Sequence, residues 1–427
     1  MGIIPSVQIG RDEAICYFHD RFAWVSASRY FVFSSSQPPA LLNMAAALGL
    51  ASFSFTRKST AMQRAAAAEY STALQSINHM LADPATATLD STLAVVILMS
   101  FFEILTGHSP PSTKSWTNHA SGAASIVALR GPGQLESPAG HQLLLEAKGM
   151  MPALRLTISQ LGLKLSTSLI HKIPVSQALV DCTRLAMEIS TPSQNHGEHV
   201  FIITGEVANL RAALEENPVI NDTAPVFDAV DKLTARLREW RLMAPVDWKY
   251  DTMEVDEQSR GAETWYGFIK PVGGRYSIYS GDHVVVGWSN YRMSCILLAE
   301  LLLGLLKRQV MASSPPSTAA LAKCRALRRT MDQMATDICA SVPYLLGLKT
   351  SAAGGALPDL SGAYMVLMPL WVAACVEGPG HPLRHSAMFL LEVLARRVGI
   401  RHASLQRHFL VSVEGMAEWL DNFPETR

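Results

Sequence analysis

Amphipathic stretches with helical periodicity run through most of this chain, and they limit its fold more than any other feature. Apolar residues recur every three to four positions, which places them on one face of a helix. The stretches are Ala61–Leu81, Trp116–Leu129, Gln177–Ile189, Glu198–Leu214, Thr223–Arg241, Val284–Val310, Leu321–Ser341 and Ser386–Val398. Strand-like alternation is confined to Tyr276–Val286, where we expect one short hairpin. The pattern predicts an all-α fold.

Residue types that begin and end helices bound several of these stretches. Pro84 follows Asp83 and ends the Ala-rich stretch, because proline cannot continue a helix. Asp90 is placed to cap the apolar run Leu93–Leu105, and Gly107 ends that run. These signals predict separate helices joined by short turns.

We expect one large helical domain over residues 1–427. A chain of 427 residues that is 49% hydrophobic can bury a large core. The stretches rich in Ser, Pro, Ala and Gly near Ser109–Ser115, Ala312–Ala320 and Ser351–Ser361 are short, which indicates loops between helices and not linkers between domains. Only Trp240–Tyr291 differs, as an irregular segment dense in aromatic and acidic residues.

The charge balance argues against direct binding of nucleic acid. Lys plus Arg and Asp plus Glu both total 36, so the formal net charge is zero. Proteins that bind nucleic acid through their own surface usually carry a basic excess, because phosphate neutralisation supplies most of the affinity. The nearest basic group, Arg325, Arg328 and Arg329, has the spacing of a solvated helix face.

Cysteine spacing and hydropathy predict a soluble, cytoplasmic protein without a cysteine-based zinc site. The six cysteines are scattered, with no CxxC pair. The first twelve residues lack the apolar region of a secretion signal. The longest apolar runs are interrupted by Glu103 and Glu300 and are shorter than the ~20 residues that a membrane span needs.

The segment Trp240–Tyr291 has the composition of a pocket mouth. It holds four of the eight tryptophans, Trp240, Trp248, Trp265 and Trp288, beside a dense group of carboxylates. Aromatic rings next to carboxylates in a long loop are typical of a lid over a binding site. The alternative is an ordinary long loop that its rings anchor to the core.

Four carboxylates in this segment are candidate ligands of Mg²⁺. Asp251, Glu254, Asp256 and Glu257 lie within seven residues, and on a helix Asp251, Glu254 and Glu257 would share one face. Oxygen ligands suit Mg²⁺, which in turn binds phosphate oxygens. The alternative is a solvated acidic loop.

The same segment offers candidate walls and anion-binding groups for a cyclisation reaction. Ring faces stabilise a carbocation by about 0.5–2 kcal/mol per contact. The candidate catalytic rings are Trp248, Trp265, Tyr266, Tyr276 and Trp288. The candidate substrate-binding residues for a diphosphate are Lys270, Arg275, Asn290 and Arg292.

Two other groups contain metal-binding residue types but favour structural roles. His196 and His199 are three positions apart where a helix begins, with no third ligand in view, which is more typical of a polar cap. Asn290, Ser294 and Glu300 have the residue types of an Asn/Ser/Glu metal motif with the wrong last spacing.

Several ordered motifs resemble the fungal-specific transcription factor domain that follows Zn₂Cys₆ clusters, as in sterol-uptake regulators. They are FFEIL at 101–105, SWTNHASGA at 115–123, LRGP at 129–132, GWSNYR at 287–292 and MPLWVAA at 368–374. The resemblance implies an all-α regulatory domain. It also implies that Trp116 and His119 pack and hydrogen-bond within the fold and do not react.

The family's six-cysteine motif does not precede these motifs here. If Met1 is the true start, we expect that the protein cannot read DNA as its relatives do. It would then act through a partner, or its pocket would serve another use. Its location would be nuclear in the regulatory case, and a homodimer stays open.

The chain also resembles the non-conventional humulene-type sesquiterpene cyclases of fungi, and two hypotheses follow. The first is a Mg²⁺-dependent cyclase that converts farnesyl diphosphate, a prenyl diphosphate, into a cyclic sesquiterpene such as humulene. The alternative is a ligand-binding transcriptional regulatory domain without its own DNA-binding module. A structural interaction protein is a third reading, and it leaves the aromatic and acidic segment unexplained. Fold-level resemblance does not decide between them.

Overall fold

The computed structural model describes residues 10–22, 38–107, 110–147, 177–189, 191–216, 223–254, 274–312, 315–347 and 360–423. These residues are almost entirely helical, which confirms the all-α prediction. They fall into two compact units, the first formed by 1–151 with 399–402 and the second by the remainder of the chain. Two compact units can belong to one domain, so the single-domain expectation stays a prediction.

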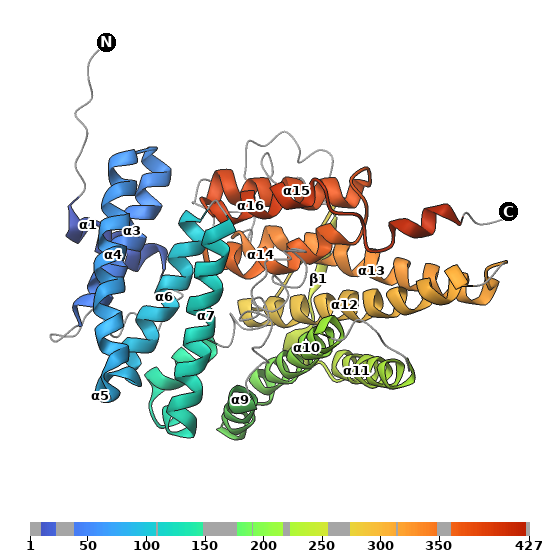
Figure 1. Ribbon diagram of the computed structural model, residues 1–427, viewed down its shortest axis with the longest axis horizontal. Coiled ribbons are helices and arrows are strands. Elements are labelled where there is room, and N and C mark those ends of the chain that lie inside the picture. The colour runs from blue at the N-terminus through green and yellow to red at the C-terminus, as the bar shows by residue number, and fades with distance from the viewer. Residues whose placement is uncertain are drawn as a thin grey trace, which may run out of the picture. The chain divides into compact units, whose positions relative to one another are not determined.

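The first unit is built from antiparallel helices that pack side by side (Figure 1). Its elements are α1 (Arg11–Arg21), α3 (Pro39–Arg57), α4 (Thr60–Ala82), α5 (Pro84–Ala87), α6 (Asp90–Thr106), α7 (Pro110–Arg130), the 3₁₀ helix η1 (Gly131–Glu136) and a helical stretch over 138–147. α6 lies at the centre, and nearly all of its residues from Ser91 to Leu105 are buried. A helix that is apolar on every side belongs in the core of a protein.

α3 is the one helix among the described residues that is long and apolar enough to cross a membrane. Its most apolar window is 67% buried inside the protein. Within the first unit it packs against α1, α4 and α6. Burial of this kind is expected for a core helix of a globular protein, so α3 is weak evidence for a membrane span.

The second unit is built around two long neighbouring helices, α12 and α13, with α14 packed on both (Figure 1). Its helices are α9 (Gln177–Ile189), α10 (Pro192–Glu216), α11 (Ala224–Leu242), the 3₁₀ turn η2 (Val246–Trp248), α12 (Asp282–Ala312), α13 (Thr318–Leu345), α14 (Leu360–Cys375), α15 (Pro382–Val393), the π-turn η6 (Leu394–Val398) and η7 (Glu418–Asn422). α16 (Arg401–Leu410) begins where the division between the units falls.

The hairpin expected over Tyr276–Val286 is wrong in its partner and its length. β1 (Asp251–Glu254) pairs antiparallel with β2 (Arg275–Ile278), and β2 packs against α13. α12 already begins at Asp282. The irregular segment is therefore shorter than expected. Its first residue, Trp240, belongs to α11, and its last residues, from Asp282 on, belong to α12.

Candidate functional site

Six aromatic residues of the second unit form one group of contacting rings, five of them buried and Tyr250 half-buried, which we call the aromatic cluster. Its members are Trp240, Trp248, Tyr250, Tyr279, Trp288 and Tyr291. The ring of Trp240 lies edge-on to Trp248 at 5.7 Å and to Trp288 at 5.1 Å between centroids, and it stacks on Tyr291 at 5.3 Å. Edge-to-face and offset pairs of this kind are favourable aromatic geometries. Of the segment's four tryptophans, Trp240, Trp248 and Trp288 meet in the fold, whereas Trp265 lies outside the described residues.

The indole N–H groups of the aromatic cluster are satisfied by the protein itself. Trp240 donates to the carbonyl of His196 at 2.7 Å, and Trp288 donates to the carbonyl of Trp248 at 2.9 Å. Trp248 donates to the carbonyl and the hydroxyl of Ser193. Buried tryptophan needs such partners. These hydrogen bonds therefore connect η2 to the start of α10 and to α12. Such connections are what we expect if the aromatic rings anchor an ordinary loop to the core, which was the alternative to a lid over a binding site.

Arg292 is buried against the aromatic cluster, with 1% of its surface exposed. Its Nη1 donates to the Tyr279 hydroxyl at 2.8 Å, and its guanidinium lies 5.1 Å from the ring centroid of Tyr250 and 5.8 Å from that of Trp288. Burial raises the pKa of Tyr279, so that hydroxyl stays protonated. The Nη2 atom of Arg292 has no hydrogen-bond partner in the part of the chain that the structure describes. A buried donor without a partner is costly and calls for an explanation.

The acidic and basic candidates of the hairpin are exposed. Asp251 and Glu254 lie on β1, where all four residues are exposed, and Arg275 lies directly opposite Glu254 on β2. Tyr276 is half-buried opposite Met253. The remaining candidates, Asp256, Glu257, Trp265, Tyr266 and Lys270, lie outside the described residues.

The described carboxylates do not form the expected magnesium site. Residues 251–254 form a strand and not a helical turn, so Asp251 and Glu254, three positions apart, point to opposite faces. The described residues contain no group of three His, Cys, Asp or Glu side chains that could hold a metal ion. The assignment of Mg²⁺ to the full set of four carboxylates stays a prediction.

The residues of the Asn/Ser/Glu motif have structural positions in the second unit. Ser294 and Glu300 contact α10, whereas Asn290 lies on the surface of α12. The Ser294 hydroxyl is buried and lies 3.0 Å from the Thr204 hydroxyl of α10. Glu300 forms an ion pair with Arg211, also on α10. Asn290 is partly exposed on α12. These contacts join α10 to α12, in agreement with the structural role that the sequence favours.

Two motifs of the first unit meet in a hydrogen-bonded chain. Tyr70 of α4 donates to Oε1 of Glu103 at 2.7 Å, and its hydroxyl lies 2.8 Å from Nε2 of His119. Burial lowers the pKa of His119 to about 4 and raises that of Glu103. A neutral His119 that donates through Nε2 to Tyr70 fits this arrangement. His119 packs and hydrogen-bonds as expected. Trp116 is buried and lies 5.9 Å from the ring of His402, but its Nε1 has no hydrogen-bond partner among the described residues, so only the packing half of its expected role is observed.

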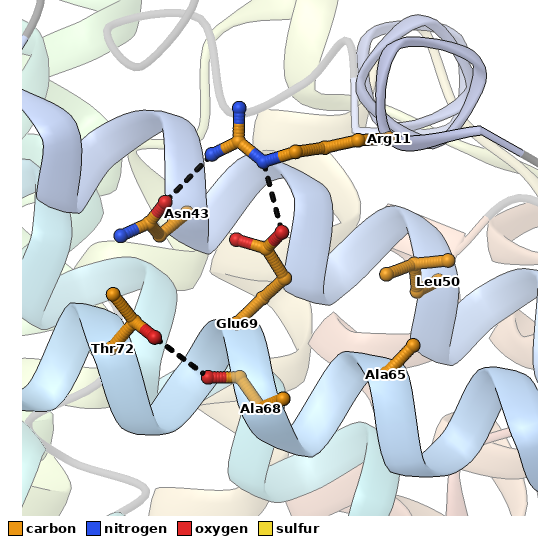
Figure 2. A pocket seen from close by; sticks show the side chains of 7 residues that line it. All are labelled: Arg11, Asn43, Leu50, Ala65, Ala68, Glu69 and Thr72. Carbon is orange, nitrogen blue, oxygen red and sulfur yellow. Dashed lines mark hydrogen bonds and ion pairs between the residues drawn. The ribbon is translucent and has the colours of Figure 1, made fainter.

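Figure 2 shows a surface hollow of about 490 Å³ in the first unit, between α1, α3 and α4. Arg11 donates through Nε to Glu69 at 2.8 Å and through Nη2 to Asn43 at 2.6 Å. The Thr72 hydroxyl donates to the carbonyl of Ala68. None of the candidate residues lines this hollow. Its polar groups largely bond to one another, so it offers little convergent chemistry to a ligand.

Sequence comparison finds the family that the motifs resemble. The family described as the fungal specific transcription factor domain matches residues 26–267, which is more than half of the chain. The chain therefore belongs to the fungal-specific transcription factor domain family. Neither a curated protein nor a solved structure matches it significantly.

Proposed function

We propose that this chain is the regulatory domain of a fungal transcription factor and works in the nucleus. The family match over residues 26–267 carries the proposal. The zero net charge supports it, because a regulatory domain need not bind phosphate itself. So does the Tyr70–Glu103–His119 chain, which places motif residues in internal contacts rather than in an open reactive site.

The ligand that we propose is a hydrophobic molecule with an anionic end. The aromatic cluster supplies apolar ring surface, and Arg292 supplies a buried cation whose Nη2 has no partner among the described residues. An oxyanion is the natural acceptor for such a group. Farnesyl diphosphate without Mg²⁺ is a suitable probe, because it combines both features.

Binding of this probe can be read from the three tryptophans of the cluster. Titration of farnesyl diphosphate should quench or shift indole emission in the native chain. The Arg292→Met variant should bind at least about tenfold more weakly, while Arg292→Lys, which keeps the charge, should bind with intermediate affinity. Equal binding by all three proteins would contradict the assignment of Arg292 but not the regulatory function.

The regulatory function itself is tested by fusion to a heterologous DNA-binding module. Transcription of a reporter with sites for that module should differ from the level given by the module alone at equal protein abundance. A fusion that carries a destabilised variant of the chain is the matched control, and it should return transcription toward the level of the module alone.

A further inference from the structure

Three large apolar side chains lie exposed near one another where α11 ends. Leu242 is 73% exposed, Met243 69% and Val246 80%, and these include the two highest values for large apolar side chains in the part of the chain that the structure describes. Single exposed apolar side chains are common on protein surfaces, whereas neighbouring ones mark interaction sites. We call Leu242, Met243 and Val246 the apolar ridge.

The sequence of α11 places the start of the apolar ridge away from the side of the helix that packs on the protein. The buried residues of α11 recur every three to four positions and form one stripe: Val226, Val230, Leu233, Leu237 and Trp240. Leu242 follows Trp240 by two positions, so it lies about 200° further round the helix. That side of a surface helix is normally polar. Leu242 is therefore not part of the stripe that packs α11.

The turn that carries Val246 is held in place by hydrogen bonds. The N–H of Trp248 donates to the carbonyl of Pro245 at 2.9 Å, and the Ser280 hydroxyl donates to the carbonyl of Asp247 at 2.5 Å. The side chain of Trp248 is itself fully buried. Because the backbone on both sides of Val246 is fixed, the ridge is preorganised, which lowers the ordering cost of binding.

The cations beside the apolar ridge are available to a partner. Arg238, Arg241 and Lys249 are exposed and form no ion pair with a residue that the structure describes. Arg236, one turn further from the ridge, is instead paired with Glu206 of α10, with Nη2 at 3.1 Å from Oε1. Exposed charges at the edge of an apolar surface steer a partner and select its sign.

The carboxylates beside the apolar ridge are fewer than the cations. Between positions 236 and 249 they are Glu239, which is exposed, and Asp247. Oδ2 of Asp247 accepts a hydrogen bond from the Ser193 hydroxyl at 2.5 Å. The charges around the ridge therefore favour a partner with carboxylates over a partner with cations.

We propose that the apolar ridge is a docking surface for a partner protein and that it binds an amphipathic helix with apolar residues along one side and Asp or Glu along the flanks. The apolar side of such a helix covers the three ridge side chains, and its carboxylates meet the cations at positions 238, 241 and 249. None of these residues belongs to the aromatic cluster. The docking surface is therefore independent of the ligand proposed for Arg292.

Two other occupants match the charges less well. In a two-fold dimer the same patch of each copy meets the other, so the cations of both copies would gather at one interface. An anionic membrane surface would attract the cations. It would, however, also face Glu239 and Asp247, which a peptide can avoid through the placement of its own charges.

Binding of a labelled synthetic peptide to the full chain tests the proposal. The probe is a helical peptide with Leu at every third or fourth position and Glu on the flanks, and its counterpart carries Lys in place of each Glu. By fluorescence anisotropy the Glu peptide should bind at least about tenfold more tightly than the Lys peptide. Its affinity should fall as salt is added, because the charges are exposed. A Glu peptide that does not bind, or that binds no better than the Lys peptide, would overturn the proposal.

A triple variant tests the ridge side chains themselves. Leu242→Ser, Met243→Ser and Val246→Ser together should weaken binding of the Glu peptide at least about tenfold and leave the urea midpoint unchanged, since exposed side chains contribute little to stability. Leu129→Ser is the matched control, because Leu129 is 72% exposed in the first unit. It should bind the peptide as the native chain does. Native affinity in the triple variant would overturn the proposal.

Charge variants and two further probes decide the nature of the occupant. Arg238→Ser with Lys249→Ser should weaken binding of the Glu peptide severalfold, whereas Arg308→Ser, at an exposed position of α12, should not. Self-association of the native chain in sedimentation, or binding to phosphatidylserine vesicles, is the third measurement. Either activity, if the triple variant loses it, would assign the ridge to a second copy or to a membrane and overturn the proposed helical partner.

Discussion

The indole ring of Trp248 lies against the backbone of Gly287, so close that a Cβ at position 287 would be 2.6 Å from Cη2 of the ring. Carbon atoms in contact are normally ~3.5–4.0 Å apart. Trp248 is fully buried and comes from η2, whereas Gly287 lies in the first turns of α12. The absence of a side chain at 287 is therefore what admits the central ring of the aromatic cluster.

Gly287→Ala should destabilise the chain by about 1–3 kcal/mol, because the added methyl group would overlap the Trp248 ring. Gly304→Ala is the matched control in the same helix, since a Cβ there meets nothing within 4 Å. That variant should be neutral or gain up to about 1 kcal/mol from better helix propensity. Urea unfolding followed by tryptophan fluorescence measures both, and equal stabilities would contradict the packing described for Trp248.

Tyr70→Phe should cost about 1–3 kcal/mol, because it leaves Glu103 and His119 without their shared partner. Tyr17→Phe is its control within the first unit. Tyr17 stacks on Phe53 at 3.9 Å, and its hydroxyl has no hydrogen bond recorded among the described residues. The difference between the two denaturation midpoints measures how much the Tyr70 hydroxyl contributes to stability. Equal midpoints would contradict a stabilising role for its hydrogen bonds to Glu103 and His119.

The first unit should lose stability as the pH falls from about 6.5 toward 4. Burial lowers the pKa values of His119 and His402 to about 4, so both rings are neutral in the fold and would take up protons on unfolding. Their contribution is present above 6.5 and is lost as the pH falls through the folded value. His119→Gln should reduce the difference between midpoints at pH 7 and pH 5, and an unchanged difference would contradict this origin.

Asp251 and Glu254 are exposed on β1, so Asp251→Ala and Glu254→Ala should change stability by no more than about 0.5 kcal/mol. These variants also test the cyclase hypothesis, which stays a prediction. That hypothesis expects the native chain to convert farnesyl diphosphate with Mg²⁺ into a sesquiterpene, detectable by gas chromatography–mass spectrometry and lost in EDTA. It further expects the product to vanish when Asp251, Glu254, Asp256 and Glu257 are all replaced by Ala.

The longer helices with one apolar face were predictable from their period, whereas the short amphipathic helix α16 was not predicted. α9 matches its predicted range, and α12 extends only two residues beyond each end of Val284–Val310. α3 was not predicted as a helix, because its apolar residues lie on every side and leave no period to detect. Tyr276–Val286 was misassigned because the end of β2 and the apolar start of α12 together imitate alternation.

The candidate site was predictable in composition but not in geometry. Trp240, Trp248 and Trp288 lie close in sequence and do meet, but their mutual packing depends on Gly287 and on partners in α10. His196 stacks on Trp240 at 4.4 Å from 44 positions away, and no local pattern indicates that contact. The role of Tyr70 could not be predicted either, because its hydrogen-bond partners lie on two other helices.

The central claim is that the chain regulates transcription, and the reporter fusion tests it most directly. Native chain fused to a DNA-binding module should change reporter transcription severalfold relative to the module alone, while the Gly287→Ala fusion should change it less than the Gly304→Ala fusion. Transcription equal to that of the module alone, with all fusions present at equal levels, would contradict the regulatory function.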